Sequence, residues 1–120
     1  MRDLNNYSKN DCIKGFLFID NDKLGEVNFK IIDESMGAIG GILIPSEKYE
    51  IYKFRIQKHC DNKGISNFDN FNFRIVLSNN KELSPEGGIG ITDIKDFDEI
   101  YVESAGIDYK TIQEINNDNL

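Results

Sequence analysis

The stretch IKGFLFIDNDKLGEVNFKII, residues 13–32, decides the fold. In its first half, Phe16 and Phe18 alternate with Leu17 and Ile19, a pattern typical of a strand that is buried on both faces. The Asn-Asp-Lys that follows has turn chemistry, and the second half alternates apolar and polar residues as a half-exposed strand does. We therefore predict an antiparallel hairpin.

Four further segments have the length and composition of strands, with turn residues between them. They are residues 38–44, 72–77, 88–94 and 99–104. Pro45 ends the first of these because it cannot donate to a sheet ladder. Together with the hairpin, these segments predict a sheet of about six strands.

A helix is predicted over residues 46–60, with Ser46 near its start and Gly64 suited to cap its end. Its best apolar stripe shares one helical face. That stripe is Tyr49, Tyr52, Ile56 and Cys60. Ile51 and Phe54 point away from it, and the same run also alternates as a strand would, so an all-β fold stays open as the alternative.

The fold class that these segments predict is α+β, a mostly antiparallel sheet with one main helix packed on one face. Asp108 is suited to cap a short terminal helix carrying Tyr109, Ile112 and Ile115. The 120 residues fit a single domain, residues 1–120. We expect residues 1–11 and 116–120 to fray.

The composition favours a basic protein partner. Asp and Glu outnumber Lys and Arg by 21 to 14, which gives a formal net charge of −7. This charge repels phosphate backbones and anionic lipids, so we expect neither nucleic-acid nor membrane binding.

The polar start of the chain lacks the apolar run of a signal peptide, so we expect a cytoplasmic protein with Cys12 and Cys60 both reduced.

Two glycine-rich apolar stretches leave backbone uncovered by side chains. They are SMGAIGGILIP at residues 35–45 and PEGGIGITD at residues 85–93. Neither has the spacing of a dinucleotide or phosphate-binding loop. The favoured interpretation is close packing, in which a bulge forms or a neighbouring ring lies on the bare backbone. The alternative is a surface for a partner or ligand.

The second glycine-rich stretch runs into the densest group of carboxylates in the chain. We predict a partner-binding edge here, because clustered like charges accelerate the encounter with an oppositely charged partner. Its candidate residues are Asp93, Asp96, Asp98, Glu99, Glu103, Gly88 and Gly90.

Catalytic and metal-binding patterns are weak in this sequence. His59 and Cys60 are adjacent, so their side chains diverge and do not form a catalytic pair by themselves. Residues 20–26 match the first positions of a calcium loop, but Leu24 and Ile31 stand where ligands are required. We expect no enzyme activity, no cofactor and no bound metal.

In size, acidity and strand-rich composition, the chain resembles the small acidic immunity proteins that bacteria make against the toxins of their neighbours. The resemblance implies a non-enzymatic inhibitor that neutralises a basic toxin or enzyme. We expect a monomer or a homodimer, since Ile51 and Phe54 would offer a dimer contact if they are exposed on a helix. Two alternatives remain: a small-ligand-binding or sensor domain with the glycine strands lining a pocket, and a carboxylate-dependent enzyme using Asp93 and Glu103.

Overall fold

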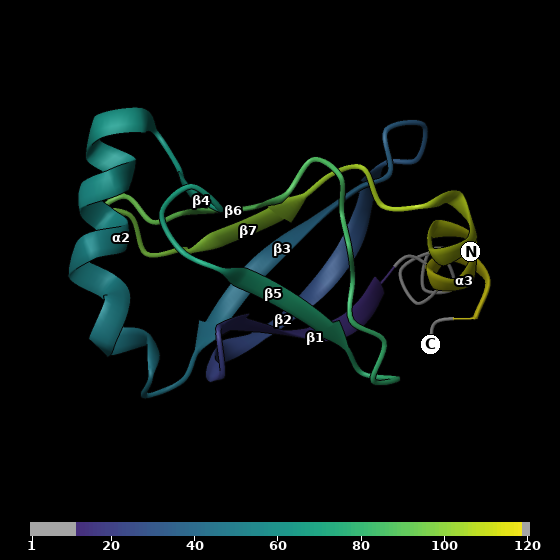
Figure 1. Cartoon of the computed structure of the whole chain (residues 1–120), viewed down its shortest axis with the longest axis horizontal. Coiled ribbons are helices and arrows are strands. Elements are labelled where there is room, and N and C mark those ends of the chain that lie inside the picture. Colours follow the sequence, from purple (N-terminus) through teal and green to yellow (C-terminus); the bar gives the residue numbers. More distant parts are fainter. Residues whose placement is uncertain (1–11, 119–120) are drawn as a thin grey trace, which may run out of the picture.

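The computed structural model describes residues 12–118, which form seven strands and two helices (Figure 1). The strands are β1 (Cys12–Ile19), β2 (Asp22–Asp33), β3 (Ala38–Pro45), β4 (Ser66–Asn67), β5 (Phe73–Leu77), β6 (Ile89–Thr92) and β7 (Tyr101–Ser104), and the helices are α2 (Tyr49–Lys63) and α3 (Tyr109–Asp118). The strands form one sheet in the order β4-β6-β7-β3-β2-β1-β5, and all neighbouring pairs are antiparallel. The α+β prediction is confirmed, with seven strands instead of six because the two-residue strand β4 pairs with β6.

The predicted β1–β2 hairpin is present, but β1 is not buried on both faces as its sequence indicates. Leu17 and Ile19 are in the core, whereas Phe16 and Phe18 lie half-buried on the opposite face. Cations cover these two rings, with the Lys23 ammonium 4.4 Å from the centre of Phe16 and the Arg74 guanidinium 5.1 Å from that of Phe18. Cation–π contact therefore shields these rings where the sequence predicts core packing.

Helix α2 confirms the predicted helix and excludes the all-β alternative. It begins at Tyr49, three residues later than expected, because the Ser46 hydroxyl donates to the Lys23 carbonyl oxygen at 2.6 Å and caps no helical N–H. Gly64 ends the helix in the left-handed conformation, its N–H donating to the Cys60 carbonyl oxygen at 2.7 Å.

Helix α3 begins as its sequence predicts. The Asp108 carboxylate accepts hydrogen bonds from the backbone N–H of Thr111 at 3.0 Å and from its hydroxyl at 2.8 Å. Ile112 and Ile115 are fully buried, while Tyr109 is exposed. The predicted fraying concerns residues 1–11 and 119–120, which lie outside the described residues, together with residues 116–118, which α3 includes.

The sheet curls around one core. Strands β5 and β6 contact each other although four strands separate them in the sheet order. The two helices lie at opposite ends of the sheet in Figure 1, so α2 closes one end of the curl instead of covering a whole face. Its buried residues Tyr49, Ile56 and Cys60 join the same core as Ile112 and Ile115 of α3.

The outer face of the sheet, which points away from this core, is not covered by either described helix. Its isoleucines Ile32, Ile42 and Ile44 remain 53%, 40% and 56% exposed. The edge strand β5, in contrast, is covered by the chain that follows it, because Leu83 donates its N–H to the Ile75 carbonyl oxygen at 2.9 Å. Part of the exposed apolar surface of the protein is therefore the outer face of the sheet.

Candidate partner-binding surface

Strands β6 and β7 form a hairpin that carries all the candidate site residues or directly adjoins them. Gly90 pairs with Glu103 within the ladder, Gly88 precedes β6, and the connection between the strands contains the remaining carboxylates. The structure divides these residues into three environments: a buried anchor, an exposed loop and the outer face of the sheet.

Asp93 is the buried anchor, and its assignment to an exposed partner-binding edge is wrong. It is 2% exposed, and its carboxylate accepts hydrogen bonds from the Tyr49 hydroxyl at 2.6 Å and the Gln57 side-chain amide at 3.1 Å. It is buried because it follows β6 directly, where the chain passes beneath α2 and the Asp93 N–H meets the Cys60 sulfur at 3.4 Å. Burial, reinforced by the hydrogen bond to Asp93, raises the pKa of Tyr49, which therefore stays a hydrogen-bond donor.

Asp96, Asp98 and Glu99 are exposed in the loop, as predicted, and none forms an ion pair with any residue from 12 to 118. They flank Phe97 in the sequence, and its side chain is 70% exposed while its N–H closes a turn onto the Ile94 carbonyl oxygen at 2.9 Å. We call residues 96–99 the hairpin tip. Phe97 is not among the residues predicted for the site, although an aromatic residue between two aspartates in a predicted loop is a usable signal.

The glycines of the outer face are covered by the protein's own side chains, in agreement with the close-packing interpretation. A Cβ atom on Gly88 would lie 2.4 Å from the Phe68 ring, and one on Gly90 would lie 2.3 Å from the Ile65 Cδ1 atom. A Cβ atom on Gly40 would meet the Tyr101 hydroxyl oxygen at 2.4 Å. Glycine at these positions allows neighbouring side chains to lie directly on the backbone.

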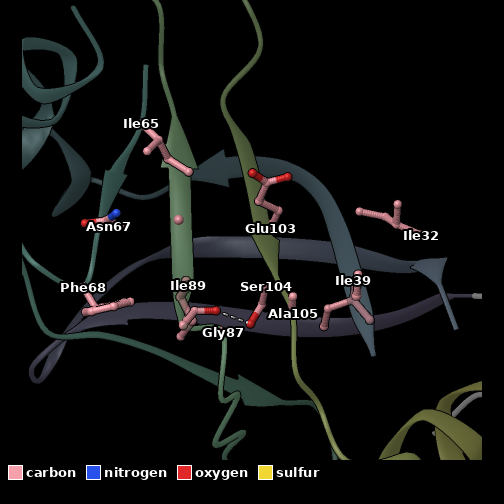
Figure 2. A pocket seen from close by; sticks show the side chains of 13 residues that line it. Ile32, Ile39, Ile65, Asn67, Phe68, Gly87, Ile89, Glu103, Ser104 and Ala105 are labelled. Carbon is pink, nitrogen blue, oxygen red and sulfur yellow. Dashed lines mark hydrogen bonds between the residues drawn. The ribbon is translucent and has the colours of Figure 1, made fainter. Parts of the chain in front are cut away.

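Two adjoining hollows on the outer face form one groove, which we call the outer trough. One hollow, of about 310 Å³, contains Gly88, Gly90 and Glu103, and the other, of about 610 Å³, lies over Gly40; both include Ile32. The main apolar walls are Ile32, Ile42, Ile44, Ile65, Phe68 and Tyr101. Figure 2 shows Ile65, Glu103 and Ile32 on successive parts of the first hollow. The outer trough therefore brings together Glu103, Gly88 and Gly90 of the predicted site.

Helix α2 has exposed apolar side chains of its own. Ile51 is 58% exposed and Phe54 is 75% exposed, as their positions off the predicted stripe indicate. Phe54 lines a separate hollow of about 330 Å³ together with Lys58, Lys95 and Asp61, so this surface carries more cations than anions, unlike the hairpin tip. It is therefore less suited to a basic partner.

His59 and Cys60 interact with different groups. The His59 Nδ1 atom lies 3.2 Å from the Ser66 hydroxyl oxygen, and its ring packs on Phe71 with centres 5.6 Å apart. The Cys60 thiol donates to the Ile91 carbonyl oxygen at 3.4 Å, and burial raises its pKa. Both cysteines are free thiols, and Cys60 has the buried environment of an unreactive one.

The partial calcium-loop match at residues 20–26 is the turn of the first hairpin. Asp22 accepts a hydrogen bond from the Tyr52 hydroxyl and pairs with the Lys48 ammonium at 3.5 Å. Within residues 12–118, no group of three or more His, Cys, Asp or Glu side chains is arranged to hold a metal ion.

Comparison of the chain with protein-family models, with curated proteins and with solved structures finds no match. Neither of the two helices in the described part of the chain is long and apolar enough to cross a membrane.

Proposed function

We propose that this protein is a non-enzymatic protein-binding module, an acidic inhibitor of the immunity-protein kind that neutralises a basic toxin or enzyme. The observation that carries the proposal is the hairpin tip, where exposed Phe97 is flanked in the sequence by three exposed carboxylates without ion-pair partners in residues 12–118. Protein interfaces commonly combine an aromatic anchor with a polar rim. The carboxylates would steer a basic partner, and Phe97 would be buried on docking.

The outer trough supports the same proposal, because it extends along the hairpin that carries the tip. Strand β7 connects the two surfaces, since Glu103 follows the tip by only four residues. A partner that docks on the tip therefore has an exposed apolar groove beside it. The net charge of −7 favours a basic partner over a second copy of this chain.

The test is a comparative capture from native lysate with three tagged proteins. They are the wild type, the tip variant Asp96→Lys, Asp98→Lys and Glu99→Lys, and a control variant Glu47→Lys, Asp61→Lys and Asp69→Lys. The control side chains are also exposed, so both variants change the net charge equally. We expect the wild type and the control variant to capture a basic protein that the tip variant does not capture. Equal capture by all three proteins would contradict the proposal.

A further inference from the structure

Glu103 has an unusual position at the centre of the outer trough. Its cross-strand neighbours are glycines on both sides, Gly40 on β3 and Gly90 on β6. In most sheets a directly opposite residue supplies a side-chain partner, often an oppositely charged one. Here glycine supplies none, and within residues 12–118 the exposed Glu103 carboxylate makes neither a hydrogen bond nor an ion pair.

Large side chains occupy the space above both glycines, and all but the Tyr101 hydroxyl group present apolar atoms there. Ile65 lies over Gly90, while Ile32 and Tyr101 lie over Gly40. The Glu103 strand position therefore has an apolar wall on the Gly90 side and a mainly apolar wall, which ends in the Tyr101 hydroxyl group, on the Gly40 side, although the Glu103 side chain remains accessible from solvent. Such walls exclude water when a ligand docks, which strengthens an ion pair with an incoming cation.

From this arrangement we infer that the outer trough binds a short extended segment of the partner, with an arginine over Glu103 and apolar residues on both sides. The inference rests on the proposed function, because it names how the basic partner is recognised. Arginine fits best because its aliphatic stem packs on apolar walls while its planar guanidinium makes paired hydrogen bonds to a carboxylate.

The dimensions of the trough set the length of this segment. Its lining residues come from or adjoin β4, β6, β7, β3 and β2, which are consecutive in the sheet. Four strand spacings of about 4.8 Å give about 19 Å, the length of roughly six extended residues. Lys30 lines the β2 end of the trough. Its positive charge repels a cation there, so we place the cation of the segment over Glu103.

The experiment uses the full ¹⁵N-labelled chain and a capped hexapeptide with one central arginine among valines. A second peptide replaces arginine by citrulline, which keeps the shape and removes the charge. Both are titrated against the wild type, Glu103→Gln and the matched control Glu47→Gln, an exposed glutamate outside the outer trough and the hairpin tip. We expect the arginine peptide to shift the Gly40 and Gly90 amide signals, and Glu103→Gln to weaken its binding by roughly fivefold or more. Glu47→Gln should leave its affinity unchanged, and Glu103→Gln should no longer distinguish arginine from citrulline.

Four outcomes would overturn the inference: no shifts at millimolar peptide, shifts confined to residues 96–99, equal binding of the two peptides by the wild type, or Gly40 and Gly90 shifts that depend on protein concentration alone. The last would indicate a second copy of the chain in the trough. If any of these occurs while the tip variant still loses a basic partner, the proposed function stands without this inference. If the arginine peptide binds as expected but charge reversal at the tip changes no capture, the proposed function fails instead.

Discussion

The Tyr49 hydroxyl donates a 2.6 Å hydrogen bond to the Asp93 carboxylate, and both side chains are almost fully buried. This bond joins the first turn of α2 to the end of β6, across 44 residues of sequence. It therefore fixes the helix to the strand that leads into the hairpin tip.

Replacing Tyr49 by phenylalanine removes this donor and leaves one Asp93 oxygen unsatisfied. We expect the free energy of unfolding to fall by about 1–3 kcal/mol, the usual cost of an unpaired buried polar group. Urea denaturation measures the change. Tyr52→Phe, which removes a hydroxyl bonded to the less buried Asp22, is the comparison and should cost less. Equal stability of Tyr49→Phe and the wild type would contradict the anchoring role of Asp93.

Gly41 and Gly90 should respond differently to alanine. A Cβ atom on Gly41 would lie 2.4 Å from the Asn28 carbonyl oxygen, which is backbone and cannot rotate away. A Cβ atom on Gly90 would meet the end of the Ile65 side chain, which can. We expect Gly41→Ala to cost about 1–3 kcal/mol and Gly90→Ala less than about 1 kcal/mol. Thermal unfolding compares the stability losses of the two variants. A larger loss for Gly90→Ala than for Gly41→Ala would contradict the claim that the backbone contact at Gly41 excludes a side chain.

The hydrogen bond from Tyr52, more than the ion pair with Lys48, holds the pKa of Asp22 below its ordinary value. This interaction stabilises the fold above the pKa of Asp22 in the unfolded chain, and its contribution is lost as the pH falls through the lower folded value. In Tyr52→Phe we expect the pKa of Asp22 to rise, and in Lys48→Met to rise less. Carbon-detected NMR titration of the Asp22 carboxyl group measures both, and an unchanged pKa in Tyr52→Phe would refute this assignment.

Phe97 and Phe54 form a matched pair, with exposed fractions of 70% and 75%. If the hairpin tip binds the partner, Phe97→Ala should weaken that complex by roughly tenfold or more, as the loss of an interface anchor does. Phe54→Ala should leave the affinity unchanged. Both variants should keep the stability of the wild type within about 0.5 kcal/mol, since each removes an exposed side chain. Isothermal titration calorimetry with the captured partner distinguishes the two, and a larger effect at Phe54 would move the interface to α2.

The local patterns of the sequence predict most of the fold. Apolar alternation identifies the β1–β2 hairpin, and Gly64 and Asp108 mark the helix ends where the structure has them. Alternation cannot tell which face of β1 is buried, because both faces are apolar. The cover over Phe18 comes from Arg74, distant in sequence. Strand β4 has only two residues and depends on its pairing with β6, so it has no sequence pattern of its own.

Only part of the candidate site can be predicted from the sequence, because local patterns do not show which distant residues come into contact. The exposed carboxylates of the hairpin tip follow from composition and a predicted loop. The burial of Asp93 depends on Tyr49 and Gln57, which the fold brings from the helix. The isolation of Glu103 depends on strand register, which places a glycine on each side of it. Neither long-range pairing can be read from a single sequence.

The most direct test of the account is the association rate of the purified partner with the wild type, the tip variant and the charge-matched control, measured at low and high salt. We predict an on-rate at least about tenfold lower for the tip variant than for the control, and a steep salt dependence that only the tip variant lacks. Equal on-rates for the three proteins, independent of salt, would contradict the claim that the hairpin tip steers a basic partner.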